Sequence, residues 1–432
     1  MRQAFNLLKQ HKLFSGIYIL GTALTIAMTM TMFIIFYVKF GPIYPEQHRD
    51  RMLVVGPLKR YPKGQPENYN IPMGHSVRFA NEYLAKLSHV EAIATVNSDY
   101  GKQEVSISDE RKTDAVVTAT NEGFWRVFGF NFIAGHPYSR KDVASHAKVA
   151  VVCRSLAQEF WATTDAVGRT LTVRDSVQVK VVGVVDDCSL AATSCYSQIW
   201  IPMQESDTTI PKFWESNHLG GCKTYLLCDK KRNIPLIQQE AESMLARINK
   251  ADKKDEYSLM GQPDTFAKSV LRTDYTKDVD VNGIIRGFLY ILLTVLIIPS
   301  LNLSGMISSR MNSRLPELGI RKAYGASNRQ LLFQVLNENF LLTAAGSVAG
   351  LVLSLIIVYT CSEWVLILFD GKFSVWTYSG VETMVTPDML FNPWVLVATV
   401  SVCLVLNTAS ALIPAWIALR KTIIESILGN EK

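Results

Sequence analysis

Four long runs without a charged residue constrain the fold of this chain more than any other feature of its sequence. A helix needs about 20 residues to cross the roughly 30 Å hydrocarbon core of a bilayer. Each run reaches that length, and core helices of water-soluble proteins rarely stay uncharged for so long. The runs are Leu13–Val38, Gly287–Ser309, Asn339–Ser362 and Met389–Leu419. We therefore predict an α-helical membrane protein with four transmembrane helices, at residues 13–38, 283–309, 339–362 and 389–419.

Lysine and arginine residues near the ends of these runs predict which side of the membrane each connection faces, because they are enriched on the cytoplasmic side. The N-terminal tail (1–12), the loop at 310–338 and the C-terminal tail (420–432) are basic, whereas the loop at 363–388 is mostly acidic. We predict a multi-pass protein of the cell inner (cytoplasmic) membrane with both termini in the cytoplasm. Residues 39–282 then lie outside, as a domain inserted between helices one and two.

The first run is predicted to be an uncleaved anchor. Its apolar stretch exceeds the 7–15 residues of a signal-peptide core, and no A-x-A cleavage site follows it. The net charge of +6 comes mostly from the cytoplasmic lysines and arginines. It is no evidence for nucleic-acid binding, and no basic patch interleaved with aromatic residues is present.

Motifs for catalysis, metal binding and cofactor binding are missing from the sequence. There is no G-x-x-x-x-G-K-[ST] phosphate loop, no H-E-x-x-H and no G-x-S-x-G. The seven histidines are scattered, and no cysteine spacing matches a zinc site. We therefore predict no catalytic residue, no metal and no cofactor, and a chain that is not itself an ATPase.

The outer segment, residues 39–282, alternates between strand-like and helix-like patterns. Strands are predicted at Met52–Gly56, Glu91–Ser98, Lys148–Cys153, Val179–Val185, Gln198–Met203 and Cys222–Cys228, and helices at Ser76–Leu87, Arg154–Trp161 and Ile234–Ile248. Such an alternation predicts a large mixed α/β extracytoplasmic domain. From Asp264 the chain is predicted to turn helical and to run into the second span as a rigid stalk.

Five of the seven cysteines fall in this outer segment, where disulfides can persist. An odd number leaves at least one thiol free or paired between chains. Cys188 and Cys195 flank a predicted loop and could be bridged, whereas free thiols explain the sequence equally well.

No Asp, Glu, Lys, Arg or His lies inside the four uncharged runs. Ionisable groups within a membrane are costly and persist where protons or ions must move, so their lack argues against a proton-coupled transporter or an ion channel. Gly346 and Gly350 form a G-x-x-x-G pattern that allows two helices to approach closely. The partner helix could belong to the same chain or to a second copy in a dimer.

The basic loop between the second and third spans carries signals for the start and the end of a short helix. Pro316 suits the first turn, where its missing N–H would have no partner anyway. Glu317 and Arg321 are four residues apart with the acid first, which is the favourable order for an ion pair on a helix. Gly325 is a natural helix stop. We predict a helix of about nine residues followed by a tight break.

Ser327 and Gln330 form a capping box that begins a second helix, which leads into the third span. Apolar residues could give the short helix a docking side, and the alternative is a plain basic connector. These apolar residues are Leu318, Ile320, Ala323 and Tyr324.

The loop sequence PELGIRKAYGAS (316–327) resembles the E-[IL]-G-[IL]-R-[KR]-A-x-G-A signature of MacB/FtsX-type ABC transporter permeases. The matching residues are Glu317, Gly319, Arg321, Lys322, Ala323, Gly325 and Ala326. Glu338, ahead of the third span, also matches, and the outer segment is similar to a MacB-like periplasmic core domain through residues 124–142 and 181–187. Tyr324 departs from the pattern, because the family usually has an aliphatic residue there.

This resemblance implies a permease subunit that works with a separate cytoplasmic ABC ATPase and with a second permease chain, as a homodimer or a heterodimer. It also implies that the short helix is the coupling helix seated in the ATPase. The coupling residues would be Pro316, Glu317, Leu318, Gly319, Ile320, Arg321, Lys322, Ala323 and Gly325. Such permeases transmit motion to their outer domain and export drug, peptide or lipoprotein-type cargo, in some cases with a periplasmic adaptor or an outer-membrane partner. The alternative is a membrane-anchored sensor or scaffold, or an FtsX-type regulator of a cell-wall hydrolase.

Overall fold

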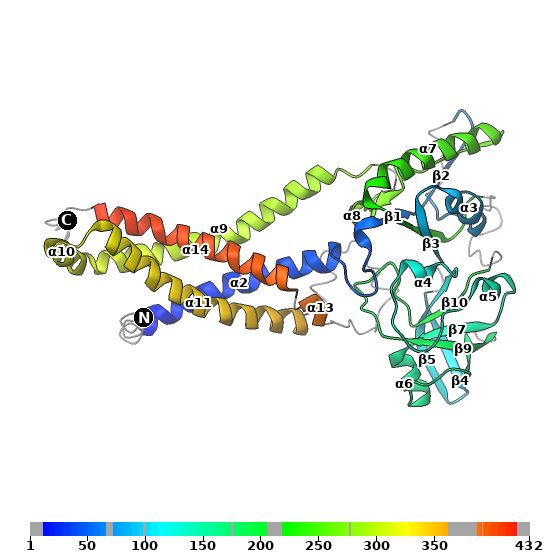
Figure 1. Ribbon diagram of the computed structural model, residues 1–432, viewed down its shortest axis with the longest axis horizontal. Helices are drawn as coiled ribbons and strands as arrows, with labels where there is room; N and C mark the ends of the chain where they lie inside the picture. Colours follow the sequence, from blue (N-terminus) through cyan, green and yellow to red (C-terminus); the bar gives the residue numbers. More distant parts are fainter. Residues whose placement is uncertain are drawn as a thin grey trace. The chain divides into compact units, whose positions relative to one another are not determined.

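The computed structural model describes residues 12–65, 72–97, 101–173, 177–204, 218–275, 278–361, 387–390 and 392–420 (Figure 1). The predictions for the two terminal tails and for most of the loop at 363–388 lie outside these residues. The chain divides into two compact units. The helical unit comprises Met1–Tyr37, Asn282–Val365 and Pro387–Lys432, and the sheet unit comprises Val38–Val281 and Leu366–Thr386.

Long apolar helices build the helical unit. They are α2 (Lys12–Phe40), α9 (Val281–Ser313), α11 (Asn328–Thr360) and α14 (Pro393–Arg420), joined by the shorter α10 (Leu315–Ala323) and α13 (Pro387–Leu390). Within the described residues, three helices are long and apolar enough to cross a bilayer: Gly16–Phe40, Asn328–Thr360 and Pro393–Arg420. The predicted second span lies in α9, where Val281–Ile297 is a shorter apolar stretch. A total of four spans stays a prediction.

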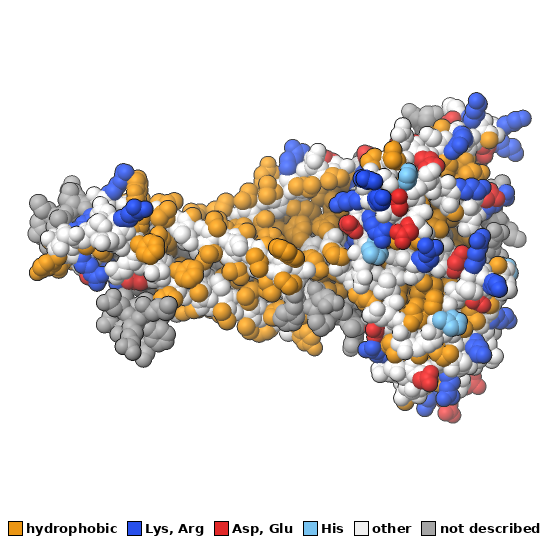
Figure 2. Space-filling model, in the orientation of Figure 1, with side chains coloured by type: hydrophobic (Ala, Val, Ile, Leu, Met, Phe, Trp, Pro, Cys, Tyr) orange, Lys and Arg blue, Asp and Glu red, His pale blue; other side chains and the backbone are white. Residues whose placement is uncertain are grey.

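Apolar side chains cover the outside of these helices (Figure 2). Leu20, Tyr290, Val348 and Val405 are each about two-thirds exposed. An apolar surface of this extent on a helix bundle suits contact with lipid, because every backbone polar group is already bonded within the helices.

Gly346 and Gly350 of α11 pack against α2 of the same chain. A methyl group added at Gly346 would lie 2.7 Å from Cβ of Thr22, and one added at Gly350 would lie 2.6 Å from the carbonyl oxygen of Ala23. Both distances are too short for real contacts, so only glycine allows the two helices this close. The G-x-x-x-G pattern therefore serves packing within one chain, the first of the two alternatives that the sequence left open.

The sheet unit contains an 11-stranded mixed sheet within the described residues. Its strands are β1 (Met52–Val55), β3 (Val90–Asn97), β4 (Lys102–Ser108), β5 (Arg111–Thr120), β6 (Phe132–Gly135), β7 (Val149–Cys153), β8 (Thr170–Val173), β9 (Val177–Val185), β10 (Ile199–Pro202), β11 (Cys222–Cys228) and β13 (Asp264–Thr265). A separate two-stranded antiparallel sheet is formed by β2 (Lys59–Pro62) and β12 (Asp255–Ser258).

The strand order β10-β7-β9-β8-β4-β5-β3-β11-β1-β13 has one additional pairing, between β10 and β5. Ile199 of β10 lies opposite Val117 of β5 in parallel pairing and opposite Val152 of β7 in antiparallel pairing. Six strands thus close into a ring: β5, β4, β8, β9, β7 and β10. Strands β3, β11, β1 and β13 extend the sheet beyond this ring. Closure leaves these six strands without an unpaired edge.

Short helices interleave with the strands, which confirms the predicted mixed α/β domain. They are the 3₁₀ turns η1 (Arg49–Arg51), η2 (Leu84–Lys86) and η4 (Lys231–Asn233) and the α-helices α3 (Val77–Glu82), α4 (Phe124–Val127), α5 (Arg140–Ala144), α6 (Arg154–Trp161), α7 (Ile234–Ala251) and α8 (Phe266–Leu271). One hydrophobic core joins α3 and α7 to β1 and β11 through residues such as Leu53, Phe79, Leu226 and Ile237.

The structure corrects the predicted stalk. Helix α8 ends at Leu271 and α9 begins at Val281, so no single helix runs from Asp264 into the second span. Arg272 has an extended backbone, and its side chain is fully buried against the Asp264 carboxylate. This buried ion pair accompanies an extended backbone at Arg272, and no local pattern in the sequence predicts it.

Of the two alternatives for Cys188 and Cys195, the structure has the free thiols, and both are buried. The Cys195 thiol donates to Glu46 Oε1 and to the carbonyl oxygen of Ala192, each at 3.6 Å. Burial raises the pKa of this thiol well above its ordinary value, and the Glu46 carboxylate raises it further. Cys195 therefore stays protonated and unreactive at neutral pH.

Candidate functional site

The short helix predicted from its end signals is present as α10, Leu315–Ala323. Gly325 has φ +93°, and its N–H bonds to the carbonyl oxygen of Lys322 at 2.9 Å, so glycine is required where the helix stops. Ser327 caps α11, and both hydrogen bonds of the capping box with Gln330 are formed, at 3.0 and 3.3 Å. Local bonds thus fix the turn between the two helices.

One side of α10 is buried in the helical unit. Leu315 and Leu318 are each 8% exposed, and Gly319 is buried beside them. They belong to one hydrophobic cluster with Leu331 of α11 and Leu419 of α14. Leu318 therefore holds α10 in place. The sequence alone suggested that Leu318 belongs to an outward docking side, but the structure buries it.

Two cations of α10 bond to the neighbouring helices. Arg321 pairs with Glu317 at 2.6 Å, as its spacing predicts, and also donates to Gln334 Oε1 of α11 at 2.7 Å. The Lys322 ammonium donates to the carbonyl oxygen of Leu419, at the end of α14, at 2.6 Å. These bonds tie α10 to α11 and α14.

A buried ion pair that the sequence reasoning missed supports the same junction. Arg314 Nη1 lies 2.6 Å from Glu338 Oε2, and Glu338 is only 8% exposed. Gln334 Nε2 donates to the other carboxylate oxygen at 3.3 Å. Glu338 stands alone directly before the apolar run 339–362, and this position could have indicated the ion pair. A buried carboxylate needs a cation close by.

The opposite side of α10 is exposed and apolar. Ile320 is 51% exposed and Tyr324 is 89% exposed, and Pro316 and Ala323 are exposed with them. Residues 316, 320, 323 and 324 fall on one face of a helix. We call this set the α10 outer face. Glu317, with its side chain 45% exposed, lies at its border.

In the sheet unit, a buried network centres on Arg49, just after the end of α2. Arg49 Nε lies 2.7 Å from Glu46 Oε2, with both side chains at most 3% exposed. Arg49 Nη1 donates to the carbonyl oxygens of Val38 and Gly41 at 2.7 and 2.8 Å, and its guanidinium stacks 4.6 Å from the ring centre of Phe266 in α8. This Arg49 network joins the exit of the first predicted span to the helix that leads toward the second.

A second network surrounds Arg272, which is fully buried. Its Nε and Nη2 atoms bond the two carboxylate oxygens of Asp264 at 2.6 and 3.0 Å, a two-pronged geometry that fixes the guanidinium plane. Nη2 also donates to the carbonyl oxygen of Met260 at 3.2 Å. Lys268 of α8 reaches Asp278 at 2.7 Å. Arg272 and Asp278, which lie between α8 and α9, are therefore bonded to β13 and to α8 respectively.

The family model for the MacB-like periplasmic core domain matches residues 15–244, which is more than half of the chain. The chain belongs to the MacB/FtsX-type family of ABC transporter permeases. A second model, for the FtsX-like permease C-terminal region, matches residues 288–423. The α10 outer face lies within this FtsX-like region, and Arg49 lies within the MacB-like region.

Several permease relatives share this similarity at low identity. The macrolide export ATP-binding/permease protein MacB of Pasteurella multocida is 23% identical over 57% of this chain and 35% of its own length. The ABC transporter permease YknZ of Bacillus subtilis is 21% identical over 63% of this chain and 64% of its own. The crystal structure of the periplasmic region of MacB from Actinobacillus actinomycetemcomitans has a TM-score of 0.35 and 17% identity, over 52% of this chain and 93% of that one. The chain thus spans about a third of the length of the MacB protein of Pasteurella multocida and less than two thirds of the length of YknZ.

Proposed function

We propose that this chain is the permease subunit of an ABC transporter and that a separate cytoplasmic ATPase drives it through α10. The α10 outer face carries the proposal. Two large apolar side chains, Ile320 and Tyr324, are held outward on a helix whose inner side is packed and hydrogen-bonded. An exposed apolar face on a rigid element favours docking to a protein partner.

Motion of the docked helix would pass into the membrane helices by the bonds that hold it. Arg321 and Lys322 link α10 to α11 and α14, and Arg314 links the end of α9 to Glu338. In this proposal these residues transmit force and do not contact the ATPase directly, which refines the role expected from the sequence. Glu317 keeps both roles, since it pairs with Arg321 and borders the outer face.

In the sheet unit, the Arg49 network would convert movement of the membrane helices into movement of the outer domain. It bonds residues 38–41 and stacks on α8, so neither connection can shift without the other. We propose mechanotransmission of this kind in the export of a drug, a peptide or a lipoprotein-type cargo. The chain would lie in the inner membrane with both termini in the cytoplasm, and a periplasmic adaptor or an outer-membrane protein could be a further partner.

Replacing Ile320 by Asp tests the proposal. The change places a charge in the docking contact, so the variant should retain the fold. The amount of ATPase that co-purifies with it should fall at least ten-fold, and the permease-stimulated ATP hydrolysis should be lost. Leu236→Asp is the matched control, because Leu236 is also 51% exposed but lies on α7 of the sheet unit. Its complex should behave as the unsubstituted one.

The complex would be purified from the native host through a tag on this chain, and ATP hydrolysis would be measured in lipid nanodiscs. Unchanged ATPase binding by Ile320→Asp would exclude α10 as the docking helix. Absence of any ATPase from the unsubstituted preparation would favour the membrane-anchored sensor or scaffold instead.

A further inference from the structure

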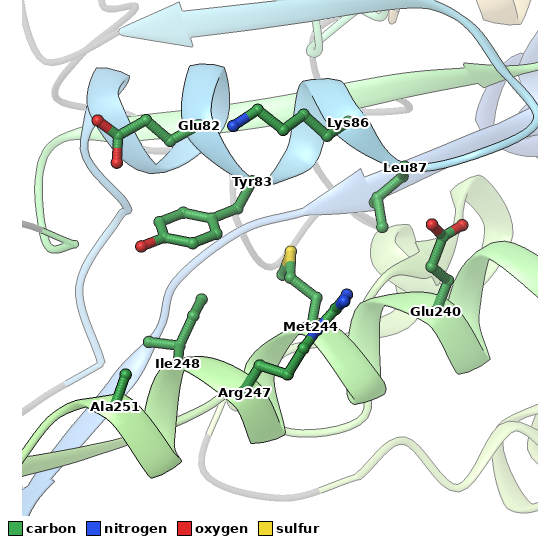
Figure 3. Close-up of a pocket in the computed structure, with 9 residues that line it drawn as sticks. All are labelled: Glu82, Tyr83, Lys86, Leu87, Glu240, Met244, Arg247, Ile248 and Ala251. Atoms are coloured by element: carbon green, nitrogen blue, oxygen red, sulfur yellow. The ribbon is translucent and has the colours of Figure 1, made fainter.

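A groove in the sheet unit lies between the α3–η2 segment and α7 (Figure 3). Its volume is about 470 Å³. This value is within the range of small-molecule sites, which are typically about 300–1,000 Å³. The groove is separate from the α10 outer face and from both arginine networks.

Apolar side chains form the floor of the groove. Leu87, Met244 and Ile248 are 5–7% exposed, and they line it together with the ring of Tyr83. Figure 3 shows Tyr83 on one wall and Met244 and Ile248 on the other turned toward one another. A ring or short chain placed there would leave water for an apolar surface, which is favourable by about 25 cal/mol per Å².

The charged residues around the floor differ in whether their side chains already have hydrogen-bond or ion-pair partners. Glu82 already pairs with Arg78 at 2.7 Å, and Glu240 accepts hydrogen bonds from the N–H and hydroxyl of Ser88 at 2.8 and 3.2 Å. In the part of the chain that the structure describes, the side chains of Lys86 and Arg247 have no such partner. They are exposed cations on opposite walls of the groove, which favours a ligand with a negatively charged acceptor group.

We propose that this groove binds a small amphiphilic anion. The aromatic or aliphatic body would lie on Tyr83, Met244 and Ile248, and the carboxylate or sulfonate would bond Lys86 and Arg247. An organic cation is less favoured, because Glu82 is already paired with Arg78 and both carboxylate oxygens of Glu240 accept hydrogen bonds from Ser88. The inference does not depend on whether an ATPase drives the chain.

Binding of 2-naphthoate to the full chain in lipid nanodiscs tests this proposal, with 2-naphthylmethylammonium as the probe of the same shape and opposite charge. Equilibrium dialysis against empty nanodiscs would remove the contribution of the lipid. We expect one naphthoate per chain and at least ten-fold weaker binding of the ammonium probe. No saturable naphthoate binding, or equal affinities for the two probes, would overturn the proposal.

Three variants locate the site. Lys86→Gln combined with Arg247→Gln should weaken naphthoate binding at least ten-fold, and Ala251→Trp should abolish it by filling the groove from its exposed end. Lys250→Gln is the matched control, since Lys250 is an exposed cation of the same helix that does not line the groove. Naphthoate binding that survives both groove variants would place the ligand elsewhere and refute the assignment.

Discussion

At the scale of single residues, loss of the Arg49 side chain should be costly. A buried guanidinium is stable only when its partners surround it, and removing one member of such a pair leaves the other charge buried alone. Glu46 is fully buried, and Arg49 Nε is its charged partner at 2.7 Å. The backbone N–H of Ser194, at 2.9 Å, could not replace that charge.

We therefore predict that Arg49→Met lowers the free energy of unfolding by about 3–5 kcal/mol. Lys112→Met is the matched control, because Lys112 pairs with Glu104 at 3.0 Å but both side chains are about half exposed. Exposed pairs of this kind contribute roughly 0–1 kcal/mol. Urea unfolding of the full chain in detergent, followed by tryptophan fluorescence, measures both, and similar losses for the two variants would contradict the importance given to the Arg49 network.

At the scale of elements, the contact between α2 and α11 depends on two missing side chains. At Gly350 the nearest atoms are the carbonyl oxygen of Ala23 and Cβ of Ile26, and neither belongs to the flexible end of a side chain. The helices would have to separate to admit a methyl group.

Gly350→Ala should accordingly destabilise the helical unit by about 1–3 kcal/mol, the usual cost of overpacking. Gly305→Ala on α9 is the control, since nothing lies within 4 Å of its added methyl group. Alanine favours helix over glycine by roughly 1 kcal/mol, so this control should be neutral or slightly stabilising. Thermal unfolding of both variants in the same detergent distinguishes them, and equal midpoints would show that the helices do not approach this closely.

Elements whose signals are local were predicted well from the sequence. Helix α6, Arg154–Trp161, and strand β11, Cys222–Cys228, have the predicted bounds. The turn at Gly325 and the capping box of Ser327 also follow from neighbouring residues alone. Propensities and caps act over a few residues, so a single sequence contains them.

Features that depend on distant partners were not predicted. Strand β13 exists because Asp264 and Thr265 pair with β1, more than 200 positions earlier in the chain, and β6 exists because it pairs with β9. The bond of Arg314, the N-cap residue of α10, to Glu338 of α11 likewise depends on packing between distant residues. Composition and spacing do not carry such information, and the inner side of α10 was misassigned for the same reason.

At the scale of the whole molecule, the resemblance to MacB/FtsX-type permeases implies that two permease chains work together. Gly346 and Gly350 are already used within the chain, so the contact between copies must use another surface. Exposed apolar residues of the long helices, such as Leu289, Leu293 and Ile297 of α9, provide candidate surfaces.

We predict two copies of this chain, or one copy with a similar permease, in each ATPase-bound complex. Native mass spectrometry of the purified complex gives the stoichiometry directly. A complex with a single permease chain would refute the prediction. Gly305→Ala is the control, because nothing lies within 4 Å of its added methyl group. This variant should give the same stoichiometry as the unsubstituted chain.

The Arg49 network also sets an order of events during biosynthesis. Arg49 lies near the amino end of the chain, but it donates to the carbonyl oxygen of Ala191 and stacks on Phe266. Its partner Glu46 accepts a hydrogen bond from the N–H of Ser194. A ribosome makes these residues long after the first helix has emerged, so Arg49 and Glu46 must wait, hydrated, until most of the outer domain has been synthesised. A chain cut short before Phe266 would leave the network incomplete, and a protease that recognises unfinished domains would find its substrate at the membrane surface.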